Sequence, residues 1–542
     1  MNVATNLKTH QENKLEKTAR LIISIFMILI MGFLTIVSLL HTTGMDVVPE
    51  IESVSYLNDN FYLNILLLAL SAAVCLIIMP LLKKMPLWVE IAVICIWTII
   101  LGLIWVYSSQ LAPSEDSYHV TDASMHFANN NYSPMNDGYF KNYSFQLGYV
   151  FFNEIIIRIA SVFTEIQDFL FLEVLNVIFL AAVYAGILLI NNKIFNDKRI
   201  CHLTFFLLLF SFQPILFSSF LYGIIPGLMF AVWAVYFEIS YLKESKIYQA
   251  ILSAVFIALA VMIKSNYNIF LIAILAMAFV KLFSRKKYIK DIVYMVLCVV
   301  LAVSITPAVK SMYESKSGID LGDSIPYVSW ISMGMNEPSF AGCAPGWYNY
   351  SCTVTNFEEN NFNSSEASKD SIENIKERLS YFISDPQYAN DFFYEKIVSQ
   401  WNETSYQSIW TNKVRGQYAE KGALASWVCN EGESAVSAFM DLYTQLIFAA
   451  VLFGVIMCTR NKNLFSTIFP LIILGGFLYH LISEAKSQYS IPYYVIMTGF
   501  AAYGLCCLYD ILAAKAGKHK WISKLFNFPK HEMSSKIEAS DK

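Results

Sequence analysis

Charged residues are scarce in this sequence: Asp, Glu, Lys and Arg make up 15% of its 542 residues, whereas a soluble protein carries roughly 25%. An ordinary soluble globular fold is therefore excluded. No CxxC pair or other Cys/His metal spacing occurs, which excludes the common zinc motifs. Glycine-rich phosphate loops and internal repeats are also missing from the sequence. The net charge of −4 gives no argument for a nucleic-acid partner.

Long apolar runs are what the sequence has instead. Hydrophobic residues make up 56% of the chain, and the mean hydropathy is +0.48. Each run is long enough to cross the ~30 Å hydrocarbon layer of a membrane. The first run lacks a small-residue cleavage site, so we expect a retained span rather than a signal peptide. We predict an all-α polytopic membrane protein with about 12 transmembrane helices, at 21–40, 62–82, 88–108, 169–191, 201–219, 223–242, 248–264, 266–283, 291–309, 437–458, 464–482 and 489–511.

The distribution of basic residues predicts the sidedness of these spans, because Lys and Arg accumulate in cytoplasmic loops. The N-terminal arm, alternate loops and the tail from Lys515 are basic, whereas 41–61 holds acids and no Lys or Arg. Both termini are therefore expected in the cytoplasm. The segment 145–163 is apolar but contains Glu154 and Arg158, and a span there would invert every later loop. We expect it to form an interfacial amphipathic helix on the outer surface.

Two extracytoplasmic segments interrupt the predicted spans, at 109–168 and 310–436. The second is polar, rich in Asn, Ser, Tyr and Trp, and long enough that a small folded domain or a function is expected. Cys343 and Cys352 lie close together within it, and whether they form a disulfide stays open. The predicted organisation is an N-terminal arm with two added spans (1–87), a membrane core containing the first outer segment (88–309), a large extracytoplasmic loop domain (310–436), and C-terminal helices with a basic tail (437–542).

Acidic residues just beyond the third span form the first candidate site. Glu115, Asp116 and Asp122 provide carboxylates that act as general bases or bind a divalent metal such as Mg²⁺ or Mn²⁺. On spacing alone, solvated loop acids are the more frequent explanation. His119 and His126 lack the i, i+4 spacing of a helical metal pair, so we do not predict them as ligands.

Two short outer turns and an aromatic loop complete the candidate sites. The turn from Lys264 to Tyr267 provides a cation for a lipid phosphate, although a lysine that snorkels to the interface is an equally good explanation. The turn from Glu484 to Tyr489 would stabilise charge on a phosphate leaving group, or it would hold only a weak Glu–Lys pair. Aromatic and amide residues of the large loop, including Trp401, suit carbohydrate rings, but such residues are also ordinary at membrane interfaces.

Short segments that contain these residues follow one another in a distinctive order: Ser114 to Ala123, Phe127-Ala128, Gly138 to Phe140, Tyr143 to Gly148, Tyr222 to Gly227, Lys264 to Tyr267, Ser399 to Asn402, Gly475 to Phe477 and Glu484 to Tyr489. The order resembles that of the GT-C glycosyltransferases, which are membrane enzymes dependent on polyprenyl-phosphate sugars. They include protein O-mannosyltransferase and aminoarabinose-transferase types, and the resemblance is closest to members from Gram-positive bacteria. It covers most of the chain from about residue 88. The chain departs from the family pattern at Ser144, Ile224 and Ser265.

The resemblance implies transfer of a monosaccharide from a polyprenyl-phosphate donor to an extracytoplasmic acceptor, with inversion at the sugar carbon. Asp116 would be the catalytic base, with Asp122 as the second candidate or its partner. The donor phosphate would be bound by Lys264, Asn266, Lys486, Gln488 and Tyr489. Further substrate contacts would come from Glu115, Tyr143, Gln146, Trp401 and Glu484. Whether a metal is needed stays open, because GT-C enzymes differ on this point.

The expected partners are the polyprenyl-phosphate sugar, a glycan acceptor and the lipid bilayer, with no nucleic acid. We favour an envelope polysaccharide as acceptor, because nothing in 310–436 is typical of a peptide-binding module. A teichoic acid, another lipid-linked glycan and a protein stay open as acceptors. A lipid-linked glycan flippase or polysaccharide transporter, a polysaccharide polymerase and a non-catalytic scaffold are the rival functions. A transporter is expected to carry charges within its spans and internal repeats, and neither is evident in the sequence.

Overall fold

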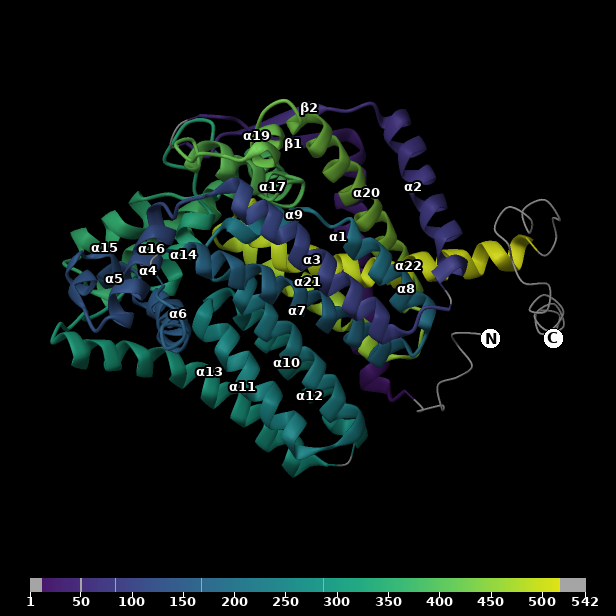
Figure 1. Ribbon diagram of the computed structural model, residues 1–542, viewed down its shortest axis with the longest axis horizontal. Coiled ribbons are helices and arrows are strands. Elements are labelled where there is room, and N and C mark those ends of the chain that lie inside the picture. Colours follow the sequence, from purple (N-terminus) through teal and green to yellow (C-terminus); the bar gives the residue numbers. More distant parts are fainter. Residues whose placement is uncertain (1–11, 49–50, 83, 167, 286, 517–542) are drawn as a thin grey trace.

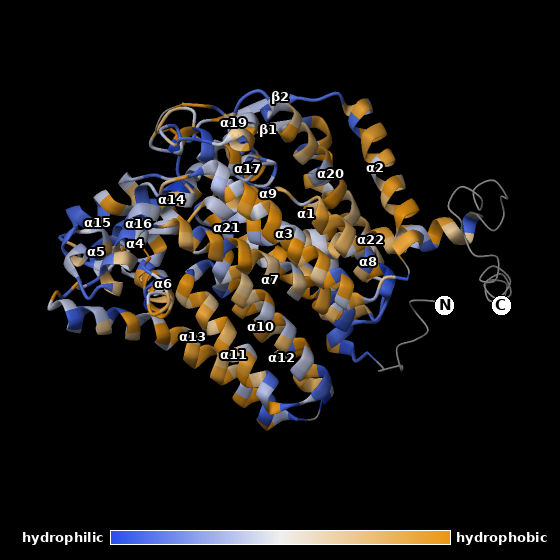
Figure 2. Ribbon diagram, viewed as in Figure 1, coloured by the Kyte–Doolittle hydropathy of each residue, from blue (hydrophilic) through white to orange (hydrophobic). Residues whose placement is uncertain are grey.

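The computed structural model describes residues 12–48, 51–82, 84–166, 168–285 and 287–516 (Figure 1). Nearly all described elements are helical. The strands among the described residues are β1 (His41–Met45) and β2 (Val54–Asn58), which form an antiparallel hairpin between the first two long helices. Apolar residues cover the long helices, and hydrophilic residues gather at their ends (Figure 2).

Ten described helices are long and apolar enough to cross a membrane, or eleven if one bent pair counts as a span. The prediction of a polytopic all-α membrane protein is confirmed. The ten are built on α1 (Lys14–Leu40), α2 (Phe61–Leu82), α3 (Leu87–Ser109), α7 (Leu170–Phe195), α10 (Ile224–Glu244), α12 (Asn268–Arg285), α13 (Tyr288–Ser317), α20 (Glu433–Cys458), α21 (Ile468–Ile482) and α22 (Ile491–Ala516). Short helical turns at Ser265–Tyr267, Leu464–Thr467 and Ser487–Ser490 extend α12, α21 and α22 to their full span lengths.

The predicted number of about 12 spans is slightly too high, for two local reasons. The segment predicted at 201–219 is broken into α8 (Lys198–Leu209) and α9 (Gln213–Leu216), with a bend of 48°. Pro214 is the second residue of the second piece, and proline supplies no backbone N–H to continue a preceding helix. The segment predicted at 248–264 is α11 (Ile247–Ile263), which has 17 residues. Such a helix rises only about 26 Å.

One continuous hydrophobic core joins α1, α3, α7, α8, α10 to α12 and α20 to α22. Small residues bring α20 and α22 close together: a Cβ added at Gly504 would lie 1.9 Å from the backbone oxygen of Ala450. Lipid tails are as apolar as helix side chains, so no hydrophobic effect drives membrane helices together. Small residues allow the helices to approach closely, and the resulting van der Waals contacts stabilise the pair.

Buried acids within the spans correct the expectation that the spans lack charge. Glu90, Glu173 and Glu238 are each fully buried in a candidate span. Glu90 is hydrogen-bonded to His202 of α8, and the carboxyl oxygens of Glu173 and Glu238 have no hydrogen-bond partner among the described residues. All three lie within two turns of a helix end.

The segment 310–436 is wrongly predicted as a large loop domain, because no separate domain is evident in it. Its Trp401, Ile409 and Val428 belong to the same hydrophobic core as the long helices. Lys396 donates to the backbone oxygens of Gly334 and, at 2.8 Å, Ser483. Part of the segment thus packs onto the bundle end, and its own apolar clusters, around Phe357 and around Phe382, are small. Its helices are α14 (Tyr327–Gly334), α15 (Asn356–Glu359), α16 (Ser364–Ser384), α17 (Pro386–Trp401), α18 (Ser408–Trp410) and α19 (Ala423–Cys429).

The first outer segment folds at the same end of the bundle, as α4 (Glu115–Ala128), α5 (Tyr139–Asn142) and α6 (Leu147–Ala160). Figure 1 shows these helices beside α14, α15 and α16. The segment predicted to be an interfacial helix is α6, which has 14 residues and is not among the candidate spans. Cys343 and Cys352 are both free.

Candidate functional site

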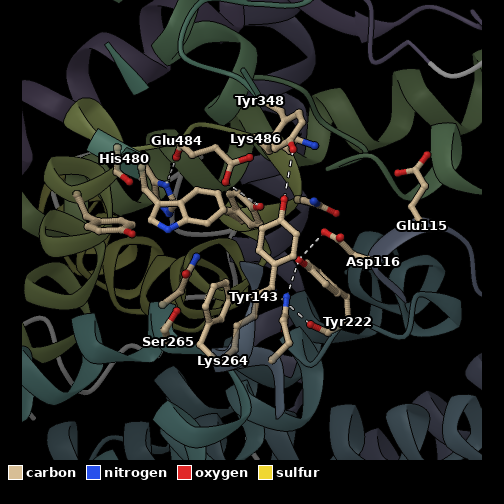
Figure 3. Close-up of a pocket in the computed structure, with 18 of the residues that line it drawn as sticks. Glu115, Asp116, Tyr143, Tyr222, Lys264, Ser265, Tyr348, His480, Glu484 and Lys486 are labelled. Atoms are coloured by element: carbon tan, nitrogen blue, oxygen red, sulfur yellow. Dashed lines mark hydrogen bonds between the residues drawn. The ribbon is translucent and has the colours of Figure 1, made fainter. Parts of the chain in front are cut away.

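A cavity of about 270 Å³ lies where the first outer segment, the large loop and two interhelical turns meet (Figure 3). It brings together most of the residues that the sequence marked, although they are far apart along the chain. Those that line it are Glu115, Asp116, Tyr143, Gln146, Lys264, Asn266, Glu484, Lys486, Gln488 and Tyr489.

Asp116 lies in the first turn of α4, where the helix dipole stabilises a negative charge. Its Oδ2 accepts a hydrogen bond of 2.8 Å from the Tyr222 hydroxyl. That hydroxyl in turn accepts one of 2.8 Å from Gln146 Nε2. The preceding Glu115 has a φ of 49°, a left-handed conformation that costs a non-glycine residue roughly 1–2 kcal/mol. Tyr222 and, through it, Gln146 thus fix the Asp116 carboxylate at the cavity wall.

Lys264 is a cation that contacts the same tyrosine as Asp116 does. It follows α11, and its Nζ lies 3.6 Å from the centre of the Tyr222 ring and 3.3 Å from the Tyr222 backbone oxygen. Burial lowers the pKa of Lys264 to about 7, although the charges of Asp116 and Glu484 oppose this shift. The amine is therefore poised between its charged and neutral forms near neutral pH.

Lys486 contributes a second cation, from the turn between α21 and α22. Its Nζ lies 2.5 Å from a carboxylate oxygen of Glu52. Burial alone would lower the pKa of Lys486, but Glu52 and Glu484 outweigh it and raise the pKa above the ordinary lysine value. Burial raises the pKa of Glu484, whose Oε2 accepts a 3.1 Å hydrogen bond from the Tyr489 hydroxyl. The cavity thus contains one lysine that titrates near neutral pH and one that stays charged.

Aromatic side chains form the remaining wall. The hydroxyls of Tyr143 and Tyr348 lie 3.4 Å apart, and the rings of Tyr143 and Trp330 are 6.3 Å apart. Tyr327, also at the cavity, is exposed. Aromatic faces with hydroxyls at their edges suit a sugar ring, which presents both apolar faces and hydroxyl groups.

Two predicted site residues lie elsewhere. Asp122 does not line the cavity, is 35% exposed in its side chain, and lies 3.5 Å from Nε2 of His126. Trp401 is buried behind the cavity, with its ring 5.7 Å from that of Phe477 and 5.5 Å from that of Tyr493. The structure therefore favours Asp116 over Asp122 as a group that meets a ligand, and it gives Trp401 a packing position.

Sequence reasoning assigned no role to several residues at or beside the cavity. Tyr222 occurred only as part of a family-like segment. Arg415, which lines the cavity, lies 2.8 Å from Glu115 and 3.5 Å from Glu52. Neither Arg415 nor Glu52 has a local sequence signal, because their neighbours at the site are hundreds of residues away.

No group of three or more His, Cys, Asp or Glu side chains placed to hold a metal ion occurs within the described part of the chain. The acids at the cavity are instead engaged by Tyr222, Tyr489 and Arg415. We derive no step through a metal ion.

No known protein family matches this chain. No curated protein matches its sequence either. It is a polytopic helical membrane protein.

Proposed function

We propose that the protein is a membrane glycosyltransferase that moves a monosaccharide from a polyprenyl-phosphate donor to an acceptor hydroxyl, with inversion. The observation that best supports this proposal is the placement of Asp116 and Lys264 on one buried tyrosine, with Lys486 at the same cavity. Direct displacement at a sugar carbon needs a base for the incoming hydroxyl and positive charge for the departing phosphate. Both groups are present at this cavity.

In the proposed reaction, Asp116 takes the proton of the acceptor hydroxyl as its oxygen bonds to the anomeric carbon. The bond between that carbon and the phosphate oxygen breaks, and its electron pair leaves with the lipid phosphate. Lys264 and Lys486 neutralise the charge that develops there, with Asn266 and Gln488 beside them at the cavity. Their burial strengthens this interaction, because Coulomb energies grow as the local dielectric constant falls.

The residues around a second cavity, which at about 10 Å³ has room for only about one water molecule, support a lipid-linked donor. This cavity shares Lys264, Asn266 and Tyr489 with the main cavity. Its other lining residues are apolar or aromatic and come from α10, α12, α22 and the turn before α12. A phosphate at the shared lysine would therefore place the first prenyl units against membrane helices.

The proposal also covers the acceptor and the side of the membrane on which transfer takes place. The aromatic wall supports a glycan acceptor, and we favour an envelope polysaccharide. The distribution of Lys and Arg supports an extracytoplasmic site in a multi-pass cell-membrane protein with both termini in the cytoplasm. A protein acceptor is less favoured, because nothing in the sequence of 310–436 is typical of a peptide-binding module.

A lipid-linked glycan flippase or polysaccharide transporter is the second candidate. The buried Glu90, Glu173 and Glu238 favour it, because ionisable residues within membrane spans often mark transport pathways. Their positions near helix ends, rather than at mid-span, weaken this case. A polysaccharide polymerase would share the lipid-linked donor but would add repeat units.

The proposal is tested with protein purified in detergent and supplied with polyprenyl-phosphate sugars and an envelope extract. We expect transfer of one sugar residue to extract glycans, measured with a radiolabelled donor. The same protein in liposomes provides the second measurement. Movement of lipid-linked glycan across the bilayer without any turnover would contradict the glycosyltransferase and favour the transporter.

Donor binding is expected to take up protons above pH 7. Because burial holds the pKa of Lys264 at about 7, most of this amine is neutral at pH 8. A phosphate beside it raises its pKa, so the complex binds a proton that the free protein lacks, and donor affinity falls as the pH rises. Calorimetry at pH 8 in two buffers of different ionisation enthalpy measures the uptake. The donor is a phosphodiester that does not titrate in this range, so equal heats in both buffers would contradict the assignment of Lys264.

A further inference from the structure

The loop between β1 and β2 reaches the candidate site, although the first two spans looked like an addition to the family-like core. Glu52 of this loop lies 2.5 Å from Lys486 Nζ and 3.5 Å from Arg415 Nη2. Its Oε1 also accepts a 3.3 Å hydrogen bond from Gln407 Nε2. Lys486 and Arg415 line the cavity, whereas Glu52 lies behind them with a side chain that is 14% exposed.

Several contacts fix the hairpin against the large loop. Asn402 Nδ2 donates to the backbone oxygen of His41 at 2.7 Å. Trp410 Nε1 donates to the backbone oxygen of Asp46 at 3.1 Å. The backbone N–H of Val54 donates to the oxygen of Gly342 at 2.9 Å. Glu52 is therefore held in place from both sides of its loop.

The charges around Lys486 show what Glu52 contributes. Arg415 repels Lys486, whereas Glu52 and Glu484 attract it. Burial raises the pKa of Glu484, which weakens that acid as a counter-ion. Burial would also raise the pKa of Glu52, but Lys486 and Arg415 outweigh it and lower the pKa, so this carboxylate stays ionised. The ring of Tyr348 lies 5.7 Å from Lys486 Nζ, and Cys343 and Tyr489 interact with Glu52. Glu115 lies 2.8 Å from Arg415 and is a second counter-ion for that guanidinium.

We propose that Glu52 is a positioning residue through which the N-terminal hairpin holds Lys486 and Arg415 side by side, both charged, at the wall of the cavity. This inference rests on the proposed function, in which Lys486 neutralises the leaving phosphate. Glu52 does not touch the substrate. It acts as the counter-ion that keeps the Lys486 ammonium charged although Arg415 repels it.

The test measures the protonation of Lys486 directly, without any sugar donor. The intact protein is methylated with formaldehyde and a borohydride reagent, and peptide mass spectrometry measures the rate at each lysine. Only the free amine reacts. Glu52→Gln is expected to raise the methylation rate of Lys486 at pH 8 by about tenfold or more, because a charge partner this close shifts a pKa by at least ~1 unit. The rate at Lys264 is expected to stay unchanged.

Asp59→Asn is the matched control. Asp59 lies in the same connection between the first two helices and accepts hydrogen bonds from Thr42 and Asn64, so its loss is expected to leave Lys486 unchanged. An unchanged rate at Lys486 in Glu52→Gln would overturn the inference. The unaltered protein provides an independent measurement: Lys486 reacting as fast as Lys264 at pH 8 would overturn it as well.

The two proposals fail separately. Slow labelling of Lys486 that depends on Glu52, in a protein that transfers no sugar, would leave the role of Glu52 intact and contradict the glycosyltransferase. Sugar transfer by a protein whose Lys486 labels independently of Glu52 would do the reverse.

Discussion

Replacing Asp116 with asparagine is expected to lower the rate of sugar transfer by about 10²–10⁴-fold, which is the typical contribution of a general base. Asparagine has the same shape and still accepts the hydrogen bond from Tyr222, but it cannot take a proton from the acceptor. The loss should appear in the turnover rate, whereas donor binding should change little. The radiolabelled transfer assay measures both quantities.

Asp122→Asn is the matched control, because it makes the same chemical change on the same helix. Its carboxylate faces His126 outside the cavity, so we expect transfer to stay within about twofold of the unaltered protein. Full activity in Asp116→Asn would remove Asp116 from the mechanism. Inactivation by Asp122→Asn alone would reverse the assignment of the base.

Replacing Lys264 with glutamine is expected to lower turnover by about 10²–10³-fold, the cost of removing one group that stabilises charge in a transition state. Glutamine is slightly shorter and still polar, so the buried site stays filled. A neutral amide, however, cannot balance the charge of the leaving phosphate. Donor affinity should fall as well, because part of the interaction already exists in the bound donor. Turnover and KM for the donor are measured separately.

Lys369→Gln provides the comparison for this change. Lys369 lies on α16 at the same end of the molecule, 66% exposed, and pairs only weakly with Glu366 on the surface. Its replacement should leave turnover and KM unchanged. If Lys264→Gln also left both unchanged, the donor phosphate would lie elsewhere, and Lys486 with Arg415 would be the remaining cations at the cavity.

The membrane class and most of the helices follow from the sequence because hydropathy is a local property. A run of apolar residues becomes a membrane helix wherever the chain carries it. The interhelical turns were predictable for the same reason: Lys264 and Asn266, like Lys486 and Gln488, are neighbours in sequence and stay neighbours at the cavity. Two predicted spans were exceptions: 201–219 is bent just before Pro214, and 248–264 is the short helix α11.

Choices between similar residues depended on the tertiary structure. Asp116 and Asp122 look alike in sequence, yet only Asp116 faces the cavity, because the side chains of α4 point in different directions around the helix. Tryptophan is a residue type that often stacks on sugar rings, but Trp401 is buried against Phe477. The polar segment 310–436 looks independent, but several of its apolar residues, such as Trp401, Ile409 and Val428, are buried in the core of the bundle.

Glu52 and Arg415 were beyond sequence reasoning altogether. The acids of 41–61 served only to predict sidedness, and nothing near Arg415 marks it as part of a site. Glu52 and Arg415 come close together because the hairpin packs against the large loop, although more than 300 residues separate them in the sequence. Local patterns determine which segments enter the membrane. Contacts between distant segments determine which charges share a cavity, because only folding brings those charges within the few ångströms over which they interact strongly.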